Sequence, residues 1–277
     1  MINKLNFFKK NGYLHLEKFL PKEEVSLVLK EAKGVFFKQF IKKGYLSLES
    51  SLDEVSEESF NNCLYRLFDD DMECLMNCGK QAQHLISLHR LSLTSNITEI
   101  LTELGLETPI ISTRPVLYFN HPKLAKKKVF YKVEAHQDWG SMQGSLNSIV
   151  VWVPLVNIDI NLGALEILPK SHLFGLRTDH IDNGFRMVSL SEEENNDLLA
   201  VEVNAGDVLI FSSFLIHQSG ENSSNKPRWS CHFRYNDLDD ITFIDRKYPH
   251  AYIYKPVNEV MTKDFPKVQD ILNIYRL

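Results

Sequence analysis

The pattern of apolar and polar residues changes near Thr108. Before this point, apolar residues recur at the spacing of one helix face after Pro21, at Val25, Val28, Leu29 and Ala32. Gly34 weakens this pattern, so we expect the helix to end or bend there. Residues 56–104 show a second, less regular helical pattern. The first hundred residues are therefore predicted to be mainly helical.

After Thr108, short runs of β-branched and aromatic residues alternate with turn signals. Residues 110–119 form the first run, in which Pro115 indicates an edge position or an irregularity. Residues 148–155 are almost continuously apolar, as expected of a strand that is buried on both faces. Shorter runs follow at 165–168, 208–211 and 229–235. Short strands without intervening helices predict an antiparallel sandwich or barrel.

The two patterns together predict an α+β chain with a mainly β core. No internal repeat and no low-complexity linker divides the sequence, so we expect a single domain over residues 1–277. This domain would comprise a helix-rich part at 1–107, a β core at about 108–240 and a C-terminal extension at 241–277.

Composition narrows the possible partners and the compartment. Apolar residues make up 44% of the chain and the formal net charge is −5, which argues against nucleic acid as the main partner. No apolar run approaches the roughly 20 residues of a membrane-spanning helix, and the charged N-terminus does not resemble a signal peptide. The four cysteines are few for this length, which favours a reducing compartment. We therefore expect a cytoplasmic protein without membrane partners.

Three of the cysteines lie in the second helical region. Cys74 and Cys78 share one helix face, and a zinc site that also uses His84 is conceivable. No second pair of ligands completes it, so buried or incidental thiols are the favoured interpretation.

The segment His136-Gln137-Asp138 carries the first chemical signal. On an extended segment, residues two apart project to the same face, so His136 and Asp138 would face one side together. His217 opens a polar stretch near the end of a later strand, whereas His232 lies in mid-strand and is predicted to be a hydrogen-bonded core residue. Two ligands from one strand and a third from a distant one would form a 2-His-1-carboxylate triad. Such a triad suits Fe(II), because coordination positions stay open for a co-substrate and O2.

A cation for an acidic co-substrate is expected near such a triad. Arg228 lies eleven residues after His217, and a guanidinium can hold a distal carboxylate through two hydrogen bonds. Ser230, two residues further along the strand, could offer its hydroxyl to the same carboxylate. Arg234 is the rival on that face by parity; the spacing and the serine partner favour Arg228.

These motifs resemble the phytanoyl-CoA dioxygenase family, a branch of the Fe(II)/2-oxoglutarate oxygenases. The resemblance covers nearly the whole chain and is strongest from about 130 to 235. It rests on the segment at 136–138 and on Trp152, Gly163, the stretch 168–172, Gly206-Asp207, the stretch 217–224 and Arg228. The stretch Phe7 to Tyr13, with Gly12 before the tyrosine, is similar to the family's "F…GY" opening.

The resemblance implies a fold and a site. The fold would be a double-stranded β-helix, or jelly roll, with N-terminal helices packed on one side. The iron ligands would be His136, Asp138 and His217, and Arg228 would bind the C5 carboxylate of 2-oxoglutarate. Further co-substrate contacts would come from Ser230, Ser219, Trp152, Gln137 and Tyr118.

This sequence departs from the family at one turn. The family often has Pro-Gly-Ser-His where this chain has Pro169-Lys170-Ser171-His172, so Lys170 calls the backbone geometry of that turn into question. We predict that His172 has a structural role near the site rather than a metal-binding one.

The reaction that the resemblance implies is hydroxylation of a small molecule by O2, coupled to decarboxylation of 2-oxoglutarate to succinate and CO2. Asp138 favours hydroxylation over halogenation, because related halogenases lack this carboxylate; desaturation, ring formation and epimerisation stay open. Two other classes of protein are possible. A cupin-like metal enzyme would give Arg228 no task, and a non-catalytic jelly-roll binding protein would be expected to lack a ligand or that arginine.

The substrate and the oligomeric state are not encoded in these motifs. Trp139, Met142 and Gln143 are candidates for lining the substrate pocket. The lysines at 126–128 could meet an anionic substrate, although a solvated loop is the favoured interpretation.

Overall fold

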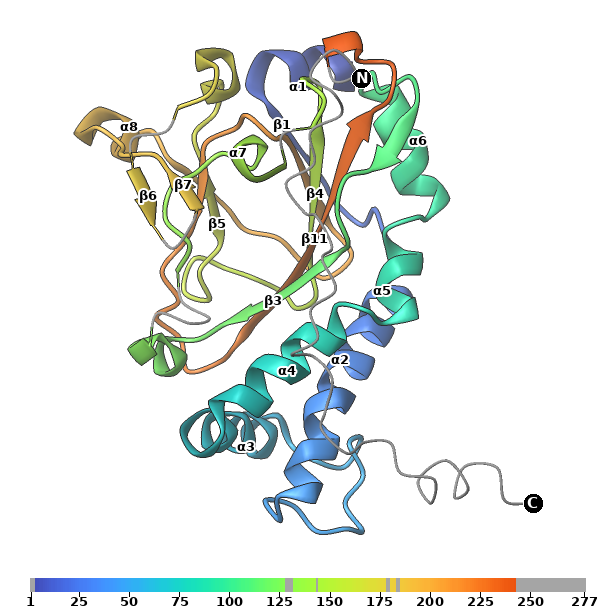
Figure 1. The fold of residues 1–277 in the computed structure, drawn as a ribbon, viewed down its shortest axis with the longest axis vertical. Coiled ribbons are helices and arrows are strands. Elements are labelled where there is room, and N and C mark those ends of the chain that lie inside the picture. The colour runs from blue at the N-terminus through green and yellow to red at the C-terminus, as the bar shows by residue number, and fades with distance from the viewer. Residues whose placement is uncertain (1–2, 128–131, 143, 178–179, 183–184, 243–277) are drawn as a thin grey trace, which may run out of the picture.

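The computed structural model describes residues 3–127, 132–142, 144–177, 180–182 and 185–242. Helices gather on one side of a β-sandwich (Figure 1). The helices of the first hundred residues are α1 (Lys4–Asn11), α2 (Lys22–Lys42), α3 (Glu57–Asp70), α4 (Met72–Ala82), α5 (Ile86–Leu91) and α6 (Ser95–Glu103). The less regular pattern at 56–104 is thus four consecutive helices.

Helix α2 joins the helical layer to the sheet. It begins after Pro21 and continues through Gly34, so the helix does not end at that glycine, which was one of the two predicted alternatives. The apolar face carries on past the glycine with Phe36, Phe37 and Phe40, all buried. Their burial outweighs the roughly 1 kcal/mol that a glycine costs inside a helix. Phe36 meets Trp229 of the sheet edge-on, with ring centroids 5.9 Å apart.

The larger sheet is antiparallel and follows the order β1-β9-β4-β11-β2, with β3 also paired to β11. Its strands are β1 (Tyr13–Leu16), β2 (Pro109–Ile111), β3 (Val116–Asn120), β4 (Ile149–Pro154), β9 (Val208–Ser212) and β11 (Arg228–Asp237). Every residue of β4 is buried, as its continuous apolar run predicted. The run at 110–119 is broken around Pro115, and both of its pieces, β2 and β3, pair with β11.

The smaller sheet has the order β10-β5-β8, formed by β10 (His217–Ser219), β5 (Leu165–Ile167) and β8 (Leu199–Val201). A hairpin of β6 (His180–Asp182) and β7 (Phe185–Met187) lies next to it. His136 bridges Met187 on one side and His217 on the other, so the segment around His136 connects the hairpin to this sheet. The short helices α7 (Trp139–Met142) and α8 (Glu192–Asn196) and the 3-10 helices η1 (Pro122–Lys127) and η2 (Ser171–Phe174) complete the described elements.

Two large apolar cores and one small cluster, formed by Ala135, Leu168, Val188 and Ile216, hold the described layers together. One large core lies between the helices and the larger sheet, and the other large core lies between the two sheets, where Trp152, Leu165, Leu209 and Phe211 pack. Two facing antiparallel sheets with helices on one side confirm the predicted α+β fold with a jelly-roll core.

The glycine of the "F…GY" opening and the Pro169-to-His172 turn contact each other. Gly12 ends α1 with φ 83°, and a Cβ there would collide with Nδ1 of His172. The Nε2 atom of His172 lies 3.0 Å from the carbonyl oxygen of Lys9, and the backbone N–H of Lys170 donates to Asn11. Lys170 has φ 68°, a left-handed conformation that glycine adopts more easily and that the lysine adopts here. His172 therefore has a structural role, but it has this role at the contact between the end of α1 and the turn at 169–172.

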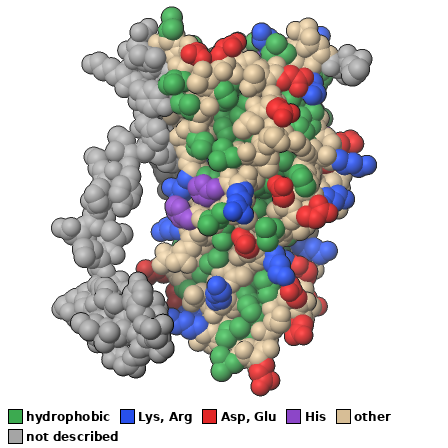
Figure 2. All heavy atoms as spheres, turned by 90° about the vertical axis from the view of Figure 1, so that its right-hand side faces the viewer, with side chains coloured by type: hydrophobic (Ala, Val, Ile, Leu, Met, Phe, Trp, Pro, Cys, Tyr) green, Lys and Arg blue, Asp and Glu red, His purple; other side chains and the backbone are tan. Residues whose placement is uncertain are grey.

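The face of the helical layer carries mixed charges. Acidic and basic side chains are interspersed among apolar ones over the face shown in Figure 2. In the described part of the chain, no helix combines the length and the apolar character needed to cross a membrane. The predicted extension at 241–277 lies almost wholly outside the described residues, and the domain boundaries stay a prediction.

Candidate metal centre

A cavity of about 610 Å³ lies in the jelly roll. Its volume falls within the roughly 300–1,000 Å³ that is typical of ligand pockets. Six residues that were proposed for the site from the sequence line this cavity beside His136, Asp138 and His217. They lie on β3, β4, β10 and β11 and are Tyr118, Trp152, Ser219, Arg228, Ser230 and Arg234, the rival of Arg228. The wall also contains aliphatic and aromatic side chains, so the interior is largely apolar.

The structure brings His136, Asp138 and His217 together. Their ligand atoms all lie within 4.8 Å of one another, and the described residues contain no other such group of three. Nε2 of His136 lies 3.9 Å from one carboxylate oxygen of Asp138, and Nε2 of His217 lies 4.0 Å from the other. Backbone hydrogen bonds of 3.0 and 3.1 Å between His136 and His217 join the two segments. Asp138 stands directly before α7, where the chain turns away.

The ring of each histidine is oriented by a contact between its Nδ1 and the backbone carbonyl two residues earlier in the chain. Nδ1 of His136 lies 2.8 Å from the carbonyl oxygen of Glu134, and Nδ1 of His217 lies 3.0 Å from that of Leu215. A ring N–H that donates to a carbonyl places the proton on Nδ1 and leaves the Nε2 lone pair for a metal. Burial, and then the nearby His136, lower the pKa of His217 to about 4. This imidazole is therefore neutral at pH 7, which is the form that binds metal.

Asp138 is an ionised carboxylate that Arg234 holds in place. Nη2 of Arg234 donates to Oδ1 of Asp138 over 2.8 Å, and both side chains are buried. Burial by itself would raise the pKa of Asp138, but Arg234 and then His217 and His136 hold it well below its usual range. Arg234, the rival for the co-substrate, is thus engaged with a metal ligand.

The environment of Arg228 differs from that of Arg234. It is only 2% exposed, and burial lowers its pKa to about 10, so it is still a cation at pH 7. Its Nη1 donates to the carbonyl of Gly163 and its Nη2 donates to Oγ of Ser219 over 3.1 Å. Its Nε has no hydrogen-bond partner, and no carboxylate among the described residues pairs with it. An uncompensated buried cation is costly, so this position fits a ligand that brings a carboxylate.

Other predicted co-substrate residues lie beside Arg228. Ser230 and Tyr118 are directly opposite each other on β11 and β3, and both line the cavity, as does Trp152 of β4. Burial raises the pKa of Tyr118 to about 12, so its phenol is protonated.

The prediction that Gln137 contacts the co-substrate is not supported by its position. Gln137 is absent from the cavity wall, because its side chain points to the face opposite His136 and Asp138. Its amide nitrogen donates to the carbonyls of Gly175 and Phe214 over 2.8 and 2.6 Å, and its oxygen accepts from the backbone of Arg177 over 2.7 Å. Gln137 therefore links the segment that carries two ligands to the segment that leads into His217.

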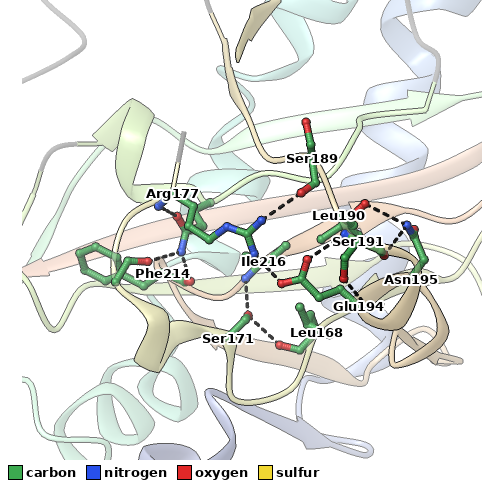
Figure 3. A network of polar contacts seen from close by, with 12 residues as sticks. Leu168, Ser171, Arg177, Ser189, Leu190, Ser191, Glu194, Asn195, Phe214 and Ile216 are labelled. Carbon is green, nitrogen blue, oxygen red and sulfur yellow. Dashed lines mark hydrogen bonds and ion pairs between the residues drawn. The ribbon is translucent and has the colours of Figure 1, made fainter. Parts of the chain in front are cut away.

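A polar network extends this linkage behind the metal ligands (Figure 3). Arg177 donates to Glu194 over 2.5 Å and to the carbonyl of Ser189 over 2.9 Å. Oγ of Ser171 accepts from the backbone N–H of Ile216 over 2.8 Å. Ile216 directly precedes His217, so these contacts restrain one ligand segment from the side opposite the cavity.

The cavity also contains residues that sequence reasoning missed. His232 lines the cavity instead of the core, although alternation with Arg228, Ser230 and Arg234 along β11 could have placed it there. Burial, followed by Arg234, holds the pKa of His232 well below its usual value. The segment Ser112-Thr113-Arg114, together with Gln83 after α4, also lines the cavity, and no sequence motif indicated it.

The weaker expectations have mixed outcomes. Trp139 stacks on Phe214 with ring centroids 5.3 Å apart, and Met142 is buried in the inter-sheet core, so neither lines the cavity. Gln143 and the side chains at 126–128 lie outside the described residues. Burial raises the pKa of Cys78 to about 12, with Cys74 adding to the effect, which fits incidental thiols rather than a zinc site.

Comparison with known proteins places this geometry in a family. The family profile described as phytanoyl-CoA dioxygenase (PhyH) matches residues 8–230. The chain is 25% identical to a phytanoyl-CoA dioxygenase of Arabidopsis thaliana, over 82% of this chain and 85% of the relative. It is also 25% identical to phytanoyl-CoA dioxygenase 1 of Oryza sativa subsp. japonica, over 91% and 96% of the two chains.

Solved structures share the fold. The epimerase SnoN, in complex with Fe3+, alpha ketoglutarate and nogalamycin RO, has a TM-score of 0.57 at 18% identity, covering 84% of this chain and 82% of its own. EctD from S. alaskensis has a TM-score of 0.56 at 18% identity, covering 87% and 78%.

The family match spans all three candidate ligands and Arg228. The length of this match and the His-Asp-His group together confirm two predictions, the cofactors Fe(II) and 2-oxoglutarate and the general class of dioxygenase. This chain belongs to the phytanoyl-CoA dioxygenase family.

Proposed function

We propose that this protein hydroxylates a small molecule at an unactivated C–H bond, using Fe(II), 2-oxoglutarate and O2 and releasing succinate and CO2. One observation carries the proposal: a triad of two histidines and a carboxylate lines the same cavity as a buried Arg228 that has no carboxylate partner among the described residues. Either feature alone would fit more than one kind of binding site. Together they match the two ends of 2-oxoglutarate, which binds a metal at one end and carries a free carboxylate at the other.

The roles of this chain's residues follow from their positions. His136, Asp138 and His217 would hold the iron on one side and leave its other positions open toward the cavity. Arg228 and Ser219, already joined by a hydrogen bond, would orient the distal carboxylate. The iron, when bound, supplies the oxidising chemistry with O2 and 2-oxoglutarate. The apolar wall with Trp152, Leu165 and Phe211 would limit water around the reacting groups.

Hydroxylation is preferred to the other outcomes that start from removal of a hydrogen atom. Asp138 keeps the third protein ligand, which disfavours a halide at that position. A methylphosphonate hydroxylase of Gimesia maris is 28% identical over 47% of this chain and 53% of its own length, which supports hydroxylation in related proteins. The fold does not decide, because SnoN is an epimerase.

The two other classes fit less well. A cupin-like enzyme that does not use 2-oxoglutarate leaves the buried Arg228 without an anion. A non-catalytic binding protein does not require the complete triad or the orientation of both histidine rings by backbone carbonyls. We also propose a cytoplasmic location, which the four free cysteines support.

Calorimetric titration of 2-oxoglutarate into anaerobic, Fe(II)-loaded protein tests the proposal. We expect metal-dependent binding, succinate release in air, and a product that has gained one oxygen atom when a substrate is found. Absence of 2-oxoglutarate binding in the presence of Fe(II) would refute the proposed function. A product of unchanged elemental composition would indicate epimerisation instead of hydroxylation.

A further inference from the structure

His232 differs in exposure from the rest of its strand. It is the one residue of β11 that is not buried, although β11 has paired strands on both of its sides. Its Cα partners are Val116 on β3 and Trp152 on β4, and both of these residues line the cavity with it. The opposite face of β11 packs into the core against the helices, through Trp229 and Phe233. The accessible part of His232 therefore opens into the cavity.

The imidazole of His232 makes no hydrogen bond with the described part of the chain. Two other polar side chains of the cavity wall share this property, Ser230 and Trp152, and both were proposed as contacts of the co-substrate. The remaining polar residues of the described wall have partners within the protein; Arg234, for example, donates to Asp138. His232 is thus the polar group of this wall that neither the protein nor the proposed co-substrate engages.

His232 lies near the metal triad without belonging to it. It stands two residues from Ser230 and two from Arg234 along the strand, roughly 7 Å from each at about 3.3 Å per residue. Burial and then Arg234 lower the pKa of His232, and the three candidate ligands also influence it, so its ring lies within electrostatic range of them. It is nevertheless outside the group of ligand atoms that lie within 4.8 Å of one another. The ring is therefore placed to contact a molecule beside the metal.

The chemistry of this ring selects the kind of group that it can bind. A neutral imidazole offers one hydrogen-bond donor and one acceptor. A charged group of a ligand would lose its water here against a ring that carries no opposite charge, which is costly. A hydroxyl or carbonyl group would instead be satisfied by a single hydrogen bond. In a largely apolar pocket, a few polar groups of this kind fix the orientation of the ligand.

We propose that His232 is a substrate-binding residue, whose imidazole forms a hydrogen bond with a hydroxyl or carbonyl group of the primary substrate. This bond would fix which C–H bond of the substrate faces the metal, with an apolar part of the molecule against Val116. The inference rests on the proposed function, because it takes the triad to be the place of reaction. An analogue without the oxygen atom would leave the ring unpaired and would bind more weakly.

The test uses two neutral probes that share a six-membered carbon ring, cyclohexanol and cyclohexanone. Anaerobic, Fe(II)-loaded protein is first saturated with 2-oxoglutarate. Each probe is then titrated into the complex by calorimetry to about 50 mM, where a Kd of roughly 10 mM would be detected. We expect at least one probe to bind. An imidazole that donates should bind both probes, whereas one that only accepts should bind cyclohexanol alone.

Variants assign probe binding to the hydrogen bond of His232. His232→Phe keeps an aromatic ring but no nitrogen, so it should weaken probe binding by roughly fivefold. His232→Gln keeps a donor and an acceptor and should recover most of this loss. In both variants the Kd of 2-oxoglutarate should stay within about twofold of wild type. His89→Phe is the matched control, because His89 of α5 is also partly exposed and lies outside the cavity wall.

Each outcome decides the question. If 2-oxoglutarate does not bind, the proposed function fails and the inference about His232 fails with it. If 2-oxoglutarate binds but His232→Phe binds the probes as well as the wild type does, or no probe binds at all, only the inference about His232 is wrong. A loss in His232→Gln as large as that in His232→Phe would also overturn it, because shape and not hydrogen bonding would then be responsible. Equal losses in His89→Phe would do the same.

Discussion

Arg228 and Arg234 stand on the same face of the same strand, yet their surroundings are opposite. Arg234 donates to the carboxylate of Asp138, so its charge is compensated within the protein. Arg228 is at least as deeply buried, and its partners are a carbonyl and a hydroxyl. A buried cation with an internal partner positions that partner, whereas a buried cation without one indicates a ligand that brings the missing charge. We therefore call the Arg234 end of this strand face the metal end and the Arg228 end the co-substrate end.

The largest effect is expected at the metal end. Arg234→Met leaves the buried carboxylate of Asp138 without its cation, so the metal-free protein should lose about 3–5 kcal/mol of unfolding free energy. Chemical denaturation of chelator-treated protein measures this loss. Arg228→Met is the matched control, since it removes an uncompensated cation and should leave the stability unchanged or higher. A large loss in both variants would remove the distinction between the two arginines.

At the co-substrate end, Arg228→Met should act on 2-oxoglutarate instead. Loss of a buried, charge-assisted contact with a carboxylate is expected to raise the Kd of 2-oxoglutarate by roughly 100-fold, at unchanged affinity for the metal. Separate titrations with Co(II) and with 2-oxoglutarate distinguish the two steps. Weaker metal binding in this variant would mean that the two ends are not independent.

Acid should weaken the metal end through His217. The pKa of this histidine is about 4 in the folded protein and about 6.5 when unfolded, so below pH 6.5 the unfolded state binds more protons. Metal-free protein should therefore lose up to about 3 kcal/mol of unfolding free energy as the pH falls from 6.5 to 4. His217→Gln should flatten this part of the profile. The same slope in the variant would assign the effect to other groups.

The smallest effect is expected for Gln137→Ala. Its amide links Gly175, Phe214 and Arg177 behind the ligands, so its loss should loosen the ligand geometry and weaken Co(II) binding by roughly tenfold. At saturating metal, the Kd of 2-oxoglutarate should stay unchanged. A selective loss of 2-oxoglutarate affinity would instead restore the role that sequence resemblance suggested for this residue.

The fold was largely predictable, because local patterns report burial. The continuous apolar run at 148–155 became the central strand β4, and Pro115 marked the break between β2 and β3. Gly34 misled the prediction, since helix propensity is a weak local preference and the phenylalanines after it find a sheet to pack against. Which surface a helix meets is not a local property.

The sequence by itself determined the chemical types and the faces of the candidate site. Alternation along an extended segment places His136 and Asp138 on one side and Gln137 on the other, and it places Arg228 and Arg234 together. Only the tertiary structure decided which arginine meets Asp138 and that Arg114 of a distant loop lies beside them. The reason is physical: a side chain's direction depends on the few bonds around it, whereas its partner depends on how segments a hundred residues apart are packed together.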